Sequence, residues 1–209
     1  MPSAREAILT PRHKRQSSGS RREDILVTSR GPVRIRPALL SDSSSFRALR
    51  LEALKNHPEA FAAAYESEAA EPDEYWVRRL PREEADSTGA LYFAESAEAL
   101  VGMAGIWRRD GRKVHHSGIV WGVYVRPEWR GLRIGEKLVT ACVGWARRHR
   151  LRMVRLATMA ANQSAVRCYE RCGFAPYGLE PEAIYYGGVA YDDLLMALRI
   201  SGQADSSAN

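Results

Sequence analysis

Apolar residues recur along the chain at two spacings, every second residue and every third or fourth residue, which are the periods of strands and helices. Residues 33–36 alternate apolar and basic side chains and predict a half-buried strand that ends at Pro37. Ser41-Asp42 offers a helix N-cap, and apolar residues follow at helical spacing from Phe46 to Leu54. The ordered chain is therefore expected to begin with a strand and then a helix.

The middle of the chain predicts an antiparallel meander followed by a long helix. Short polar segments separate three β-prone runs, which cover residues 89–95, 100–107 and 118–125. Apolar residues then recur every three or four positions from Ile134 to Arg150, which predicts an amphipathic helix. Two short helices are expected ahead of the meander, near Pro58 and Pro72.

The last part of the chain alternates strand and helix. A strand is predicted over residues 153–158 and a helix over about 162–172, which Gly173 ends. Further strands are expected near Phe174 and over residues 191–198. The element order predicts a mixed α/β fold, with a mostly antiparallel sheet flanked by helices.

The composition fits one domain. A chain of 209 residues that is 45% hydrophobic can form one well-buried core. No window holds the roughly 18 uncharged apolar residues of a membrane-spanning helix, and no apolar segment typical of a secretory signal follows the basic start. Three cysteines are too few for a disulfide framework and are expected as reduced thiols. We therefore expect a cytoplasmic protein without membrane contact.

The net charge of +6 is concentrated near the N-terminus, because residues 1–30 hold seven of the 31 Lys and Arg residues but only three of the 25 Asp and Glu residues. Residues 1–30 are expected to form a disordered basic tail, residues 31–201 the domain, and residues 202–209 a disordered C-terminus. The nearly neutral domain lacks the basic field that duplex binding requires. Nucleic acid is therefore not the expected partner, and any binding through the tail would be salt-sensitive and lost when residues 1–30 are deleted.

One segment has the composition of an anion site. Arg130-Gly131-Leu132-Arg133-Ile134-Gly135 joins the strand that ends near Val125 to the start of the long helix. Helix N-terminal amides lack helical partners and favour an anion, here a phosphate or diphosphate. The two glycines allow close backbone approach, and the two arginines with Lys137 add positive charge. The spacing matches neither a Walker A loop nor a dinucleotide fingerprint. The alternative is a tight turn with solvated arginines.

Three segments together resemble the GNAT superfamily of acyl-CoA-dependent N-acetyltransferases: Val123-Tyr124-Val125-Arg126-Pro127, the 130–135 loop, and Asn-x-x-Ala-x-x-x-Tyr-x-x-x-Gly-Phe from Asn162 to Phe174. The resemblance extends from Val33 to Ile200. It implies a GNAT-like fold and acetyl transfer from acetyl-CoA, a cosubstrate, to a primary amine by direct attack. The family usually has a third glycine where this chain has Arg133. We expect a helical, negative φ there, which would preserve the amide donor.

The resemblance also implies roles for individual residues. Arg130, Gly131, Leu132, Arg133, Ile134 and Gly135 would hold the diphosphate, and Val123, Tyr124 and Val125 would leave their neighbouring strand to pair with the pantetheine arm. Asn162 would bind that arm and also cap its own helix. Tyr169 would be the acid that serves the departing thiolate. Gly122 is compatible with a bulge, although an ordinary central strand is the alternative for this segment.

The acceptor and the general base are the open parts of this interpretation. The acceptor would be a small-molecule or peptide amine, bordered by the first helices and by a hairpin around Ile184 to Tyr191. No carboxylate occurs in residues 118–125, and the base is left unassigned among Glu66, Glu68, Glu71, His115 and His116. The alternative function is a non-catalytic acyl-CoA-binding or regulatory protein on the same scaffold. A homodimer is compatible with the exposed strand edges of the family. No metal site is expected.

Overall fold

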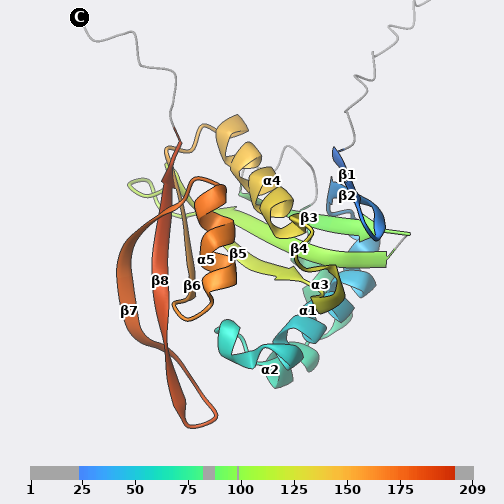
Figure 1. Cartoon of the computed structure of the whole chain (residues 1–209), viewed down its shortest axis with the longest axis horizontal. Coiled ribbons are helices and arrows are strands. Elements are labelled where there is room, and N and C mark those ends of the chain that lie inside the picture. Colours follow the sequence, from blue (N-terminus) through green and yellow to red (C-terminus); the bar gives the residue numbers. More distant parts are fainter. Residues whose placement is uncertain (1–23, 82–87, 98, 201–209) are drawn as a thin grey trace, which may run out of the picture.

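The computed structural model describes residues 24–81, 88–97 and 99–200, and eight strands within these ranges form one sheet (Figure 1). The strand order is β1-β2-β3-β4-β5-β6-β8-β7. Every neighbouring pair is antiparallel except β5 and β6, which are parallel. The strands are β1 (Asp24–Thr28), β2 (Gly31–Pro37), β3 (Gly89–Ser96), β4 (Ala99–Arg108), β5 (Ser117–Val125), β6 (Met153–Met159), β7 (Ala175–Tyr186) and β8 (Val189–Arg199).

Helices cover both faces of the sheet. On one face lie α1 (Ser43–Asn56), α2 (Tyr65–Ala69) and α3 (Asp73–Arg78), and on the other lie α4 (Ile134–Arg148) and α5 (Gln163–Arg171). Short 3-10 turns are η1 (Leu40–Asp42), η2 (Pro58–Ala60) and η3 (Pro127–Trp129). No helix in the described ranges is both long and apolar enough to cross a membrane.

Two apolar cores, one on each face, hold these layers together. On the α4 face, Leu138 and Trp145 are fully buried against strand residues such as Val154. On the α1 face, Phe46 packs edge-to-face on Trp76, with ring centroids 5.5 Å apart. Burial of such side chains contributes roughly 1.5 to 3 kcal/mol each. The sheet therefore fixes α1 and α4 on opposite sides of the same central strands.

A bulge and a divergence in β5 shape the centre of the sheet. Met103 pairs with Tyr124 and Gly105 with Trp121, so β5 carries one more residue than β4 between these pairs. Gly122 lies in the bulge with φ +63°, a conformation that favours glycine. In the described chain, β5 pairs with β6 only over Ser117–Ile119. The rest of β5 therefore leaves β6, and no described strand pairs with its edge towards Val125.

The predicted fold class is confirmed, and the tail boundary is corrected. The strand and helix order of the expected meander, the long helix and the last hairpin all occur. The tail predicted to reach residue 30 instead contains β1, because Ile25, Leu26 and Val27 are β-prone and a turn at Gly31, φ +103°, returns the chain along β2. The predictions for residues 1–23 and 202–209 lie outside the described residues.

Candidate active site

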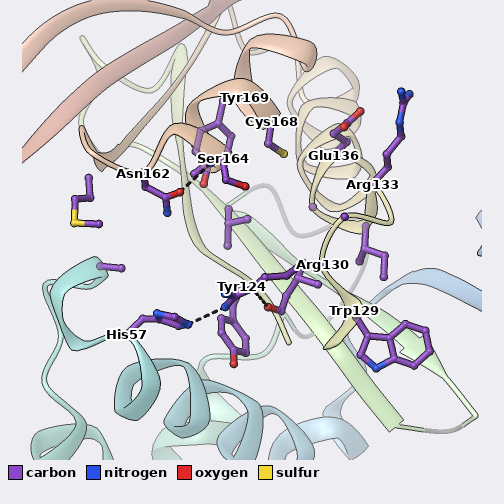
Figure 2. Close-up of a pocket in the computed structure, with 18 of the residues that line it drawn as sticks. His57, Tyr124, Trp129, Arg130, Arg133, Glu136, Asn162, Ser164, Cys168 and Tyr169 are labelled. Atoms are coloured by element: carbon purple, nitrogen blue, oxygen red, sulfur yellow. Dashed lines mark hydrogen bonds between the residues drawn. The ribbon is translucent and has the colours of Figure 1, made fainter. Parts of the chain in front are cut away.

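A cavity of about 450 Å³ lies where β5 and β6 diverge (Figure 2). Its walls come from residues in four segments: 57–61 at η2, 123–125 in β5, 129–136 at the start of α4, and 159–171 along α5. The predicted site residues Val123, Tyr124, Val125, Arg130, Gly131, Arg133, Ile134, Gly135, Asn162 and Tyr169 all line it. Leu132 does not line it, because its side chain packs against the core on the α4 face. The fold thus brings the three predicted segments to one cavity.

The loop before α4 presents a row of free backbone donors. Lys137 N–H donates to Arg133 O at 3.2 Å and is the first amide of α4 with a helical acceptor. The amides from Gly131 to Glu136 have no hydrogen-bond partner among the described residues. Gly131 has φ +76°, and a Cβ there would meet nothing within 4 Å, so the loop is open at this point. Free amides at a helix N-terminus form an anion site.

Arg133 corrects one expectation about this loop. Its φ of +59° and ψ of +16° are left-handed, whereas a helical φ was expected. The chain must turn sharply into α4 at this residue, and the turn needs a positive φ even though the side chain carries a Cβ. A non-glycine residue in this conformation costs roughly 1 to 2 kcal/mol. The amide donor is retained, but the backbone is strained.

The arginine side chains do not gather at the free amides. Arg133 extends away from the cavity, as Figure 2 shows. Arg130 folds back instead, and its Nε donates to the Val125 carbonyl at 3.0 Å. Its Nη2 lies 2.8 Å from His57 Nε2, and its guanidinium carbon lies 5.9 Å from the centre of the Tyr124 ring. The expectation that Arg130 and Arg133 point their charge at the anion site is therefore wrong for this conformation.

The β5 wall differs on its two faces. Val123 and Val125 pack towards the α4 core. Tyr124 is buried on the α1 face, and its hydroxyl donates to Glu52 Oε1 at 3.0 Å. Burial raises the pKa of the Tyr124 phenol, and the charge of Glu52 adds to the effect. Arg126 holds Glu52 in an ion pair of 2.9 Å, so this wall has a fixed shape.

The α5 wall carries the amide and phenol side chains. Asn162 caps α5, since its Oδ1 accepts from Ala165 N–H at 3.1 Å, as its N-cap role predicted. Tyr169 is 7% exposed, and its hydroxyl has no hydrogen-bond partner in the described chain. Burial raises the pKa of this phenol above its ordinary value, and the neighbouring Cys168 adds to the shift. The phenol is therefore protonated at neutral pH and can donate.

The five candidate bases lie outside the cavity. Glu66, Glu71, His115 and His116 do not line it. Glu68 is buried, and it pairs with Arg50 Nε at 3.0 Å and Arg79 Nη1 at 2.9 Å. Burial alone would raise the pKa of Glu68, but these two arginines outweigh that effect and lower it. A carboxylate held in this way is part of the scaffold. The Ile184–Tyr191 hairpin also lies outside the cavity lining.

The sequence interpretation missed several polar residues that line the cavity, among them His57 and Glu59. His57 and Glu59 flank Pro58 in η2 and both line the cavity. His57 Nδ1 lies 3.6 Å from Glu59 Oε1. A histidine directly after a predicted helix and before a proline was the available signal, but no motif connects it to segments more than 60 residues away. The described residues contain no group of three or more His, Cys, Asp or Glu side chains suited to a metal ion.

Solved structures share this fold. An acetyltransferase of the GNAT family from Streptococcus pneumoniae superposes with a TM-score of 0.72 at 20% identity, and the match covers 81% of this chain and 99% of that chain. The protein yncA of Salmonella typhimurium, solved with its cofactor acetyl-CoA, gives a TM-score of 0.67 at 19% identity, covering 85% and 99% of the two chains.

Sequence relatives agree with the fold. An aminoglycoside N(6')-acetyltransferase type 1 from Stenotrophomonas maltophilia is 28% identical over 53% of this chain and 72% of its own length. A mycothiol acetyltransferase from Thermobispora bispora is 30% identical over 66% of this chain, but over only 45% of its own length. Residues 51–174, more than half of the chain, match the acetyltransferase (GNAT) family. The chain therefore belongs to the GNAT family of acetyltransferases.

Proposed function

We propose that the protein transfers an acetyl group from acetyl-CoA to a primary amine by direct attack in a ternary complex, without a covalent enzyme intermediate. Membership of an acetyltransferase family supports transfer chemistry. The observation that carries the finer assignment is that one cavity holds the free amides of Gly131–Glu136, an edge of β5 that no described strand pairs with, and the Tyr169 phenol.

The cavity suits both ends of acetyl-CoA. The amides from Gly131 to Glu136, at the positive end of α4, would bind its diphosphate. The edge of β5 over Val123–Val125, with Arg130 displaced from the Val125 carbonyl, would pair with the amides of the pantetheine arm as an additional strand would. Asn162 keeps its side-chain NH₂ for the same arm, because only its oxygen is used in the cap. A similar fold has been solved with acetyl-CoA.

The chemistry needs an oxyanion donor and an acid. An amide of Val123 or Tyr124 would stabilise the charge on the thioester oxygen during amine attack. Tyr169 would serve the departing thiolate. An ordinary thiol titrates near ~8.5 and a phenol near ~10, and burial raises the pKa of Tyr169 further. Full proton transfer from the phenol is therefore uphill, and a hydrogen bond to the thiolate is the role that we assign to it.

The acceptor is proposed only as a primary amine, on a small molecule or a peptide. Similar proteins are named as an aminoglycoside N(6')-acetyltransferase, a mycothiol acetyltransferase and a ribosomal-protein-alanine N-acetyltransferase, so their acceptors differ widely. A cytoplasmic location is part of the proposal, because Cys142, Cys168 and Cys172 are free thiols, which is typical of a reducing compartment.

Thiol release from acetyl-CoA tests this function. The panel would contain an aminoglycoside, a polyamine and an alanine-terminated peptide, and mass spectrometry would identify the acetylated product. Acceptor-dependent thiol release with a product heavier by one acetyl group is expected. Saturable acetyl-CoA binding without acceptor-dependent release would instead support the alternative, a non-catalytic acyl-CoA-binding protein. S-acetylpantetheine, which lacks the diphosphate, is the matched ligand control and should bind much more weakly.

A further inference from the structure

Among the described residues that line the cavity, His57 is the one histidine, and its surroundings fix its tautomer. His57 Nε2 lies 2.8 Å from Arg130 Nη2. A guanidinium has donors only, so the contact requires Nε2 to accept. The proton of the neutral ring then sits on Nδ1, on the side of Glu59 Oε1 at 3.6 Å. Nε2 therefore carries a lone pair on the cavity side of the ring, which is what a general base needs.

The backbone holds His57 at the cavity wall. Its N–H donates to Ala53 O at 3.0 Å at the end of α1, and Pro58 begins η2 directly after it. Its ring lies 6.1 Å from the Tyr124 ring, centroid to centroid. The side chain is 30% exposed, so solvent can take up a proton from it. The charged and titratable groups that face the ring are Glu59, Arg130 and Tyr124.

Arg130 covers both His57 and the edge of β5 in this conformation. One guanidinium bonds the Val125 carbonyl and the Nε2 lone pair, at 3.0 and 2.8 Å (Figure 2). The first acceptor belongs to the strand edge proposed for the pantetheine arm, and the second belongs to the imidazole. A ligand that pairs with β5 and carries phosphates must displace this guanidinium and would attract it. Binding of the cosubstrate would thus free Nε2.

We propose that His57 is the general base that deprotonates the acceptor amine, that Glu59 is its positioning residue, and that acetyl-CoA uncovers it by displacing Arg130. The proposal rests on the proposed function. Nε2 takes one proton from the ammonium, and the amine lone pair then forms the C–N bond as the C–S bond breaks. The second amine proton goes to the thiolate, so the products are the amide, CoA thiol and one proton that His57 returns to solvent.

The test is the pH dependence of kcat for wild type, His57→Gln and Glu59→Gln, with each amine of the panel that supports turnover. Wild type should lose activity towards acid. The kcat of His57→Gln should be about 100-fold lower or more, and its pH profile should no longer fall towards acid. Its KM for acetyl-CoA should stay within about threefold of wild type. Added imidazole should partly restore the activity of His57→Ala. Glu59→Gln should lower kcat while the KM for acetyl-CoA stays near the wild-type value, because the ring loses the carboxylate beside its Nδ1. His115→Gln, an exposed histidine outside the cavity, is the matched control.

The possible results distinguish failure of the His57 assignment from failure of the proposed acetyltransferase function. An unchanged kcat and acid limb in His57→Gln would overturn the base while the acetyltransferase stands. Wild type that binds acetyl-CoA but turns over no amine would overturn both. If His57→Gln does not fold, Glu59→Gln decides: a lower kcat at a wild-type KM for acetyl-CoA supports the base, and an unchanged kcat contradicts it. Independently of activity, ¹⁵N NMR of the free protein should find the His57 proton on Nδ1, and a proton on Nε2 alone would contradict the arrangement.

Discussion

The two sides of the cavity are built differently. The side proposed for the cosubstrate consists of backbone: amides of Gly131–Glu136 and the edge of Val123–Val125. The side proposed for the amine consists of side chains, with His57 and Glu59 from η2 and Tyr124 from β5. A backbone site is set by where a helix starts and where two strands part. A side-chain site can change with single substitutions, which fits one family whose named members differ in acceptor.

The two sides also differ in what supports them. The α4 loop is held by its own turn, at the cost of a left-handed Arg133. The other side rests on charged pairs around α1: Arg36 with Asp42 at the start of this helix, Arg50 with Glu68 along it, and Glu52 with Arg126. The amine side should therefore be more sensitive to pH and to removal of single charges.

The largest effect is expected at the phenol that would serve the departing thiolate. Tyr169→Phe should lower kcat by about 100-fold or more, because the thiolate loses its donor, while acetyl-CoA affinity stays within about threefold. Steady-state kinetics and calorimetric titration measure the two quantities. Tyr177→Phe, an exposed tyrosine on β7, is the control. Unchanged turnover in Tyr169→Phe would remove the assigned role.

Removing Glu68 should lower the stability of the helices that support the amine side of the cavity. Glu68→Ala leaves Arg50 buried without its partner, and breaking a buried pair costs about 3 kcal/mol of unfolding free energy or more. Urea unfolding measures the loss. Glu66→Ala, two residues away and exposed, should stay within about 0.5 kcal/mol of wild type. Equal effects of the two variants would contradict the buried pairing.

Acid should weaken the contact between β2 and β3, where Glu95 pairs with Arg34 and Arg36. Hydrogen bonds from Arg36 lower the pKa of Glu95 to about 2, and Arg34 contributes. A carboxylate with a folded pKa below its unfolded value stabilises the fold above about pH 4.5, and this stabilisation is lost as the pH falls towards 2. Glu95→Gln should cost roughly 2 kcal/mol at pH 7 and flatten the unfolding free energy between pH 5 and 2. If the unfolding free energy of Glu95→Gln changed with pH as steeply as that of wild type, the low pKa assigned to Glu95 would be contradicted.

The smallest effects are expected in the α4 loop. Arg133→Gly should stabilise the fold by roughly 0.5 to 1 kcal/mol, because glycine adopts the left-handed conformation without strain but loses more entropy on folding. Gly131→Ala, at φ +76°, should destabilise by about 1 kcal/mol. Chemical denaturation of both variants measures whether each substitution raises or lowers the free energy of unfolding. Destabilisation by Arg133→Gly would show that its side chain outweighs its backbone strain.

The difference between the backbone side and the side-chain side of the cavity also explains what the sequence could predict. The 130–135 loop has a local signature, since glycines and a helix start lie within a few residues. The strain at Arg133 was missed because its φ depends on how the chain enters α4. His57 reaches Arg130 only through the packing of α1 on β5, and no local pattern encodes that approach. The β1 strand was missed because its hydrophobic run, Ile25 to Val27, follows a basic segment.

An NMR titration tests the central claim most directly. Acetyl-CoA would be added to ¹⁵N-labelled protein, and the amide signals of Gly131–Glu136 and Val123–Val125 would be followed. Binding of the diphosphate and the pantetheine arm should shift these two groups most, and S-acetylpantetheine should shift only the second. Saturable binding that leaves the Gly131–Glu136 amides unmoved would contradict the account.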